Sequence, residues 1–118
     1  MIRLCGSDEV DEGQTKQIVV DGQEAFFVCR QNGSFHVLDD ECTHGLASLS
    51  EGWLEEGRII CPLHGGAFDL TTGKALALPC KAPVRAYAAQ IRDAAVWIDP
   101  SRGIGKPPAA VSPIGKPG

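Results

Sequence analysis

The sequence has no long apolar run, few basic residues and an odd number of cysteines. No stretch approaches the roughly 20 consecutive apolar residues that a membrane-spanning helix requires. The first residues also lack the apolar core and the cleavage site of a secretory signal. We therefore expect a soluble, cytoplasmic protein with no membrane anchor. Lys and Arg number 11 against 15 Asp and Glu, so the net charge is −4, which argues against nucleic acid as a partner.

The five cysteines are Cys5, Cys29, Cys42, Cys61 and Cys80. An odd count in a chain without a secretory signal argues against a framework of disulfides. In a reducing compartment, such cysteines are core residues, metal ligands or nucleophiles. Cys29 lies in an apolar stretch, and we expect it in the core. Cys5 and Cys80 belong to no motif, and the sequence assigns them no role.

The residue pattern over 1–99 is that of short strands, and no segment keeps a helical period over three turns. Asn32-Gly33 separates two runs rich in aromatic and β-branched residues, which is a strong hairpin signal. We predict one all-β domain over 1–99, a small sandwich or barrel of antiparallel strands, in which only 46–54 is ambiguous. The expected strands are 17–20, 24–31, 34–38, 58–61, 67–70, 84–91 and 95–98.

Residues 100–118 differ in composition, because nine of these nineteen residues are Pro or Gly. Such a segment does not sustain a helix or a central strand. Its composition predicts a flexible C-terminal tail. The alternative is a docking arm for a partner, which is supported only by the repeated sequence Ile-Gly-Lys-Pro, at 104–107 and 114–117.

Two short motifs each combine a cysteine with a histidine. They are Cys42-Thr43-His44-Gly45 and Cys61-Pro62-Leu63-His64-Gly65. Thiolate and imidazole together suit zinc, copper or the iron of an iron–sulfur cluster. Structural zinc sites usually pair two cysteines in one knuckle and two histidines in the other. Mixed knuckles instead allow one iron to take both cysteines and a second iron to take both histidines, as in a Rieske centre.

The pattern C-x-H-x16-C-x-x-H resembles the Rieske ferredoxins of bacterial aromatic-ring-hydroxylating dioxygenase systems. The likeness continues through 61–75 (CPLHGGAFDLTTGKA) and covers roughly residues 1–99, but not the tail. It implies stacked antiparallel sheets, with two cluster-binding loops at one end, within about 40–80. It further implies one [2Fe–2S] cluster, with the ligands Cys42, His44, Cys61 and His64. The histidines would bind through Nδ1, so that their Nε2 protons respond to the redox state.

Two absences in these loops indicate the kind of Rieske protein. High-potential members of respiratory chains have an extra cysteine in each loop, where this chain has Ala47 and Leu63. Those members also direct a serine and a tyrosine hydroxyl at cluster sulfur, where this chain has Gly66 and Phe68. Fewer hydrogen bonds to sulfur favour the low end of the Rieske range, a potential of about −150 mV.

The chain contains only three histidines. After the cluster, His36 alone is left, and we expect it to be an ordinary strand residue. One histidine cannot build the two-histidine, one-carboxylate iron site of an oxygenase subunit. No glycine-rich dinucleotide fingerprint follows a strand, so the chain is not the reductase.

The resemblance therefore implies a monomeric one-electron carrier without a catalytic site of its own. It would accept electrons from a flavin-containing NAD(P)H-dependent ferredoxin reductase and pass them to the Rieske subunit of a terminal oxygenase. Two alternatives remain at this point. One is the small Rieske subunit of a nitrite reductase or another oxidoreductase, and the other is a structural zinc-binding interaction module.

Several residues near the loops suggest how partners would be met. The acidic residues form either a docking rim or a solvated surface, and these are 39–41, Glu51, Glu55 and Glu56. Three apolar residues would form a lid over the cluster, and these are Leu46, Leu63 and Pro79. Trp53 and Trp97 are expected to be core or sheet residues rather than electron relays.

Overall fold

The computed structural model describes residues 1–43, 47–62, 65–78 and 80–104. These residues form eleven short strands and three single-turn 3-10 helices, with no α-helix in this part of the chain. None of its helices is long and apolar enough to cross a membrane. The prediction of an all-β fold is therefore confirmed. The elements are β1 (Ile2–Gly6), η1 (Ser7–Glu9), β2 (Thr15–Ile18), β3 (Phe26–Gln31), β4 (Ser34–Asp39), η2 (Leu49–Glu51), β5 (Trp53–Glu55), β6 (Arg58–Ile60), β7 (Ala67–Asp69), β8 (Ala75–Ala77), β9 (Ala86–Tyr87), β10 (Gln90–Arg92), β11 (Ala95–Ile98) and η3 (Pro100–Arg102).

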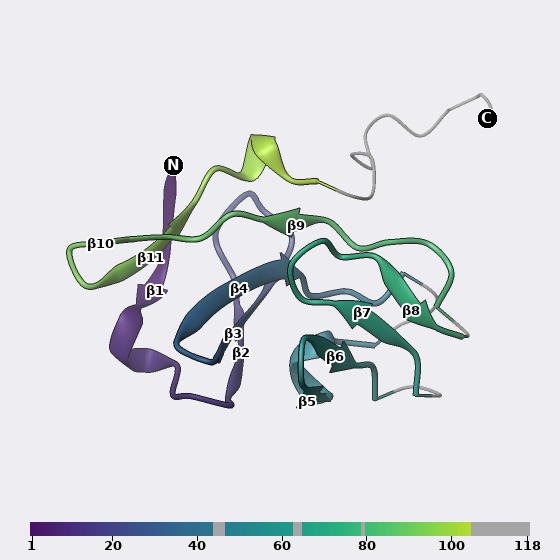
Figure 1. The fold of residues 1–118 in the computed structure, drawn as a ribbon. Helices are drawn as coiled ribbons and strands as arrows, with labels where there is room; N and C mark the ends of the chain where they lie inside the picture. The colour runs from purple at the N-terminus through teal and green to yellow at the C-terminus, as the bar shows by residue number, and fades with distance from the viewer. Residues whose placement is uncertain (44–46, 63–64, 79, 105–118) are drawn as a thin grey trace, which may run out of the picture.

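The strands make three antiparallel sheets, in the orders β1-β11-β10, β2-β3-β4-β9 and β5-β6-β7-β8. Figure 1 shows the three sheets following one another across the molecule, with β5–β8 at the end opposite the β10–β11 hairpin. The β5–β8 sheet, with the chain on either side of it, corresponds to the cluster-binding part that the resemblance implies. The other two sheets form the rest of the body.

The β3–β4 hairpin follows the sequence signal directly. Asn32 and Gly33 have positive φ values of 55° and 79°, as the two central residues of a type I′ turn require. Gln31 pairs with Ser34 across this turn, and the register places Cys29 opposite His36. His36 is half-buried within the sheet, so it is the strand residue that the sequence predicted.

The expected strand 84–91 is divided between two sheets. Its first part is β9, which pairs with β4, and its last part belongs to β10, which pairs with β11. Asp93 and Ala94 form the turn of the second hairpin with φ values of 52° and 57°. The expected strands 84–91 and 95–98 are thus separated by a tight turn, but 84–91 is not one continuous strand.

Two groups of buried residues make the core. The first lies under the β5–β8 sheet and contains Phe27, Leu38, Leu49, Ile59, Phe68 and four cysteines, among them Cys29. The second lies under β1 and β11 and contains Cys5 and Tyr87. The expectation that Cys29 is a core residue is confirmed, because its side chain is fully buried.

The two tryptophans lie on strands, as expected. Trp53 is on β5 and is 53% exposed, so it is a sheet residue but not a core residue. Trp97 is on β11, where its Nε1 donates to the carbonyl of Arg92 at 3.1 Å. The Arg92 guanidinium also lies 5.8 Å from the centre of the Trp97 ring.

Part of the predicted tail belongs to the folded body. Ile104 forms an isolated bridge with Ala86, in which each amide donates to the other residue's carbonyl, at 2.7 and 2.8 Å. Residues 105–118 lie outside the described part of the chain. A domain boundary at 99 therefore stays a prediction.

Candidate metal centre

The two predicted ligand cysteines occupy equivalent places in two loops. Cys42 follows β4, and its amide donates to the carbonyl of Ala47 at 2.9 Å. Cys61 directly follows β6, and its amide donates to the carbonyl of Gly66 at 2.6 Å. In each case the cysteine closes its own loop onto the residue five positions later. The segments 44–46 and 63–64 lie outside the described residues, and with them the predicted ligands His44 and His64.

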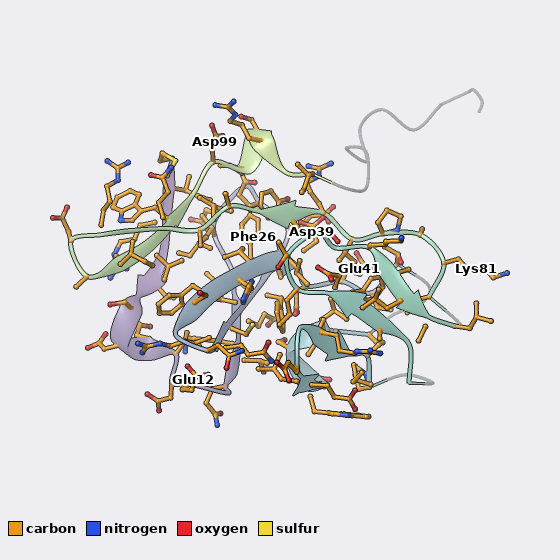
Figure 2. All side chains as sticks on the ribbon, in the orientation of Figure 1. Glu12, Phe26, Asp39, Glu41, Lys81 and Asp99 are labelled. Atoms are coloured by element: carbon orange, nitrogen blue, oxygen red, sulfur yellow. The ribbon has the colours of Figure 1, made fainter. Side chains whose placement is uncertain are left out.

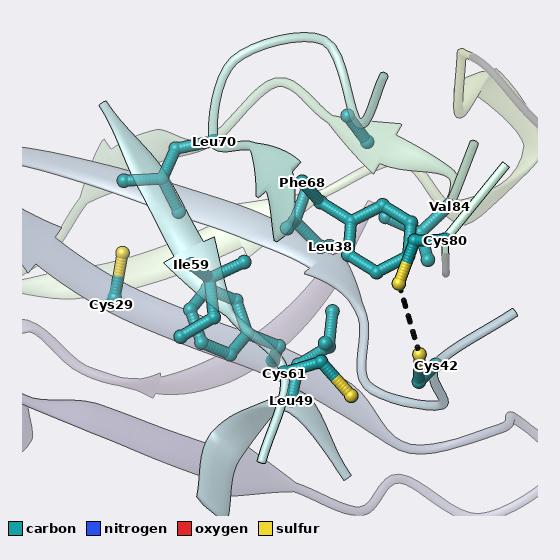
Figure 3. Packing of buried hydrophobic residues seen from close by; sticks show 12 residues of the cluster. Cys29, Leu38, Cys42, Leu49, Ile59, Cys61, Phe68, Leu70, Cys80 and Val84 are labelled. Atoms are coloured by element: carbon teal, nitrogen blue, oxygen red, sulfur yellow. Dashed lines mark hydrogen bonds between the residues drawn. The ribbon is translucent and has the colours of Figure 1, made fainter. Parts of the chain in front are cut away.

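Both cysteines are shielded from water. Cys42 is 2% exposed and Cys61 is fully buried. They pack in the core group that includes Leu49 and Phe68, and Figure 3 shows their sulfur atoms toward one end of that group, with Cys29 away from them. A thiol in this setting is held in place and is kept from solvent, which suits a metal ligand more than a surface nucleophile.

A third loop reaches the same place and brings in Cys80. The Sγ atoms of Cys80 and Cys42 are 3.7 Å apart, a hydrogen-bonding separation that far exceeds the about 2.05 Å of a disulfide. Figure 3 marks this contact with a dashed line. The sequence assigned no role to Cys80, because 38 positions separate it from Cys42 and no motif contains it.

Gly66 makes room for the Cys80 side chain. A Cβ atom at position 66 would lie 2.2 Å from Sγ of Cys80 and 3.2 Å from its Cβ. The backbone of Gly66 does not have positive φ, so the glycine is needed for space rather than for conformation. Gly65, in contrast, has a φ of 74° and no atom within 4 Å of such a Cβ.

The first and third loops are also joined through Thr43. Its hydroxyl donates to the carbonyl of Ala82 at 2.7 Å. The amide of Cys80 donates to the carbonyl of Ala77 at 3.1 Å and so shapes the turn that follows β8. Three separate segments thus meet at the two predicted ligand cysteines and hold one another in position.

The acidic residues before the first loop correct one prediction. Asp39 is 7% and Asp40 1% exposed, so neither belongs to a docking rim or to a solvated loop. Figure 2 shows Asp39 inside the molecule, near Phe26, whereas Lys81 points outward. The physical reason is that each carboxylate accepts hydrogen bonds from donors on other segments of the chain. Only Glu41 of this trio is exposed.

The partners of the two buried carboxylates are distinct. Tyr87 donates its phenol proton to Oδ1 of Asp39 at 2.7 Å. Asp40 accepts from Nε2 of Gln17 at 2.8 Å. It also accepts from the amide and the hydroxyl of Ser50, at 2.8 and 3.1 Å. Asp40 therefore anchors η2, on which the chain leaves the first loop, to β2.

The remaining predicted acidic residues are on the surface. Glu51, Glu55 and Glu56 are exposed, and Glu55 makes an ion pair of 3.9 Å with Arg58. These three still fit either a docking rim or a solvated face. The apolar lid of Leu46, Leu63 and Pro79 lies outside the described residues.

His36 takes no part in this centre. Burial lowers the pKa of its imidazole, and its neighbour across the sheet is Cys29. Within the described ranges, no three His, Cys, Asp or Glu side chains gather closely enough to hold a metal ion. The described part of the centre therefore contributes two buried thiols and needs ligands from the two gaps.

The donor chemistry fits an iron–sulfur cluster. Two buried cysteines in equivalent loops supply soft thiolates for one iron, and the loop interiors that would complete the set each contain one histidine in the sequence. Zinc would accept the same donors, but a structural zinc site usually takes two cysteines from one knuckle. Each knuckle in this sequence has only one.

Comparison with known proteins gives a consistent result. The model of the Rieske [2Fe–2S] domain family matches residues 1–88. The ferredoxin component of the p-cumate 2,3-dioxygenase system of Pseudomonas putida is 36% identical over 100 residues, which are 84% of this chain and 85% of that protein.

Solved structures resemble the fold as well. The ferredoxin of Sphingomonas yanoikuyae B1 superposes with a TM-score of 0.80 and is 39% identical, over 83% of this chain and 96% of that one. A chain in the complex of reduced oxygenase and oxidized ferredoxin in carbazole 1,9a-dioxygenase gives a TM-score of 0.79 at 32% identity. That match covers 91% of this chain and 96% of the other.

Proposed function

The chain belongs to the Rieske [2Fe–2S] domain family, and from this membership we propose that it is the ferredoxin of an aromatic-ring-hydroxylating dioxygenase system. It carries electrons one at a time to the terminal oxygenase and has no catalytic site of its own. The observation that carries this proposal is the pair of equivalent cysteine loops, in a chain whose relatives are ferredoxin components of such systems.

The proposed ligands are Cys42 and Cys61 for one iron and His44 and His64 for the other. When bound, the cluster supplies reversible one-electron chemistry, with a potential set by its ligands and surroundings. The described residues fix the two thiols before the cluster arrives, because each loop is closed by the amide of its own cysteine. Little ordering of these two thiols is then left for cluster binding to impose.

The surrounding side chains keep water away from the thiol side of the site. Leu49, Ile59 and Phe68 are fully buried beside Cys42 and Cys61. A dry, packed wall disfavours the extra negative charge of the reduced state. This burial agrees with the low potential that the sequence predicts, about −150 mV.

The partners follow from the same role. A flavin-containing reductase would donate the electrons, and the Rieske subunit of the terminal oxygenase would receive them. The complex of oxygenase and ferredoxin solved for carbazole 1,9a-dioxygenase supports the second partner. Leu78, which is 72% exposed just before the third loop, offers an apolar contact for weak, short-lived docking. We place the protein in the cytoplasm, where NAD(P)H feeds such reductases, and expect a monomer.

The test begins with iron and acid-labile sulfide analysis of the purified protein and an EPR spectrum after dithionite reduction. We expect two irons and two sulfides per chain, and the low average g value of a histidine-ligated cluster. The loaded protein should then be reduced by NADH in the presence of a flavin-dependent ferredoxin reductase from an aromatic dioxygenase system. A colourless protein that binds zinc would refute the electron-carrier role.

A further inference from the structure

We propose that Cys80 is a positioning residue that donates a hydrogen bond from its thiol to the sulfur of Cys42 and thereby raises the reduction potential of the cluster. This inference rests on the proposed function, because it takes Cys42 as a ligand. It concerns a residue outside both ligand loops. It deepens the proposed function by naming what sets the potential of this particular chain.

The direction of the hydrogen bond follows from the ligand state of Cys42. The two Sγ atoms are 3.7 Å apart, and in the metal-free chain either one has the chemistry to donate. A thiolate bound to iron carries no proton and can only accept. Cys80 must then be the donor, and an ordinary thiol keeps its proton at neutral pH.

The position of Cys80 is determined by the fold. Its side chain is 3% exposed and fills the space in which a side chain at position 66 would otherwise begin. The backbone of Gly66 lies on one side, and the hydrogen bond from the Cys80 amide to the carbonyl of Ala77 holds the turn from the other. The thiol therefore points at Cys42 without freedom to turn toward solvent.

This arrangement replaces donors that the sequence lacks. Gly66 and Phe68 carry no hydroxyl group, so the loop of Cys61 offers no side-chain donor at these places. The thiol comes instead from the third loop and occupies the room that Gly66 leaves. The glycine at 66 and the cysteine at 80 are consequently a matched pair.

The effect on the potential has a definite sign. Reduction adds one negative charge, which spreads over the sulfur atoms, and a donor to such a sulfur stabilises the reduced state more than the oxidised state. A thiol is a weak donor. We expect its loss to lower the equilibrium constant for reduction about threefold, which is about 28 mV at 59 mV per factor of ten for one electron.

The experiment measures the potential of the loaded protein by protein-film voltammetry in four single variants and one double variant. Cys80→Ala removes the donor, and Cys80→Ser keeps a donor in its place. Gly66→Ala leaves the thiol in the chain but puts a methyl group where Sγ lies. Cys5→Ala is the matched control, since Cys5 is an equally buried cysteine in the other core group.

We expect a lower potential in Cys80→Ala and Gly66→Ala, a potential at or above the wild-type value in Cys80→Ser, and no shift in Cys5→Ala. The double variant of Gly66→Ala and Cys80→Ala should match Cys80→Ala alone. Resonance Raman spectra in D2O should show a deuterium shift of the iron–thiolate stretch in the wild type that Cys80→Ala lacks. Equal potentials in all loaded variants would overturn the proposal.

A variant that fails to bind the cluster also gives information. If Cys80→Ala does not bind the cluster, the potentials of Cys80→Ser and Gly66→Ala are compared instead. A lower potential in Gly66→Ala than in Cys80→Ser supports the proposal, and equal potentials overturn it. If neither of these loads, or if the average g value changes in Cys80→Ser, Cys80 is a ligand or a structural necessity, and the tuning role is refuted. A wild-type protein without iron and sulfide refutes the proposed function itself, so the two failures are distinguishable.

Discussion

The phenol of Tyr87 on β9 donates a 2.7 Å hydrogen bond to the buried carboxylate of Asp39 at the end of β4. The contact joins residues 48 positions apart and lies directly before the loop that carries Cys42. The rings of Tyr87 and Phe26 also pack in a T-shaped arrangement, with the ring centres 5.4 Å apart. This one side chain therefore ties the end of β4 to both of its neighbouring strands.

Replacement of Tyr87 by Phe should destabilise the protein by about 1–3 kcal/mol, because the buried carboxylate of Asp39 loses a donor while the ring packing is kept. Urea unfolding followed by far-ultraviolet circular dichroism measures the loss. A free energy of unfolding equal to that of the wild type would show that water or another group replaces the phenol at no cost.

Tyr87 should also make the free energy of unfolding depend on pH in the alkaline range. Burial and the neighbouring Asp39 raise the pKa of Tyr87 above its ordinary value. The folded state thus favours the protonated phenol, so its contribution is fully present below the unfolded pKa of about 10 and is lost as pH rises through the folded pKa. We expect the difference in unfolding free energy between wild type and Tyr87→Phe to shrink above about pH 10. Parallel curves from pH 8 upward would contradict this.

Replacing the buried Asp40 by alanine should destabilise the protein more than replacing its exposed neighbour Glu41. The substitution removes the acceptor of three hydrogen bonds from Gln17 and Ser50 and should cost about 3 kcal/mol, while Asp40→Asn keeps one acceptor oxygen and should cost less. Glu41→Ala is the control, with an expected change within about 0.5 kcal/mol. Thermal unfolding and the loss of visible absorbance should rank the three variants in this order.

Two glycines with similar φ values allow the cost of backbone strain to be measured apart from the cost of a steric clash. Gly57 and Gly73 have φ values of 75° and 77°, but only at Gly73 would a Cβ meet another group, the carbonyl oxygen of Val84 at 2.0 Å. Gly57→Ala should cost about 1–2 kcal/mol from backbone strain alone. Gly73→Ala must also displace the backbone at Val84 and should cost clearly more, as measured by chemical denaturation. Equal losses would mean that the chain at Val84 yields freely.

The ligand assignment predicts a sharp division among cysteines and histidines. Alanine at Cys42, His44, Cys61 or His64 should abolish the two irons and two sulfides per chain, since each iron would lose a ligand. His36→Ala and Cys5→Ala should retain them, because His36 lies within a sheet and Cys5 in the other core group. Iron and sulfide analysis of matched preparations checks this division, and a loaded His44→Ala protein would contradict the assignment.

The parts of the fold that the sequence predicted are those with local signals. The hairpin at Asn32-Gly33 needs only its own turn residues, and its strands were placed almost correctly. β1 was missed because its pairing partner is β11, at the far end of the chain. The division of 84–91 was missed because Ala88 and Ala89, between β9 and β10, give no turn signal.

The centre shows the same contrast. Cys42 and Cys61 could be predicted as ligands because each belongs to a short motif with its own spacing, and this assignment stays a prediction. The contact of Cys80 with Cys42 depends on three loops meeting in space, and no local pattern contains that information. Asp39 and Asp40 were predicted wrongly for the same reason. A run of acidic residues indicates a surface, unless donors from distant strands, here Gln17 and Tyr87, form hydrogen bonds with the carboxylates.

The bridge between Ala86 and Ile104 also has a consequence for association between molecules. β9 ends the sheet β2-β3-β4-β9, and its outer side would present unpaired backbone groups if nothing covered it. An open strand edge of this kind recruits a strand from a second molecule and starts aggregation. A chain shortened to end at Asp99 would expose the Ala86 amide at this edge. The few residues after β11 therefore prevent β9 from pairing with a strand of a second molecule.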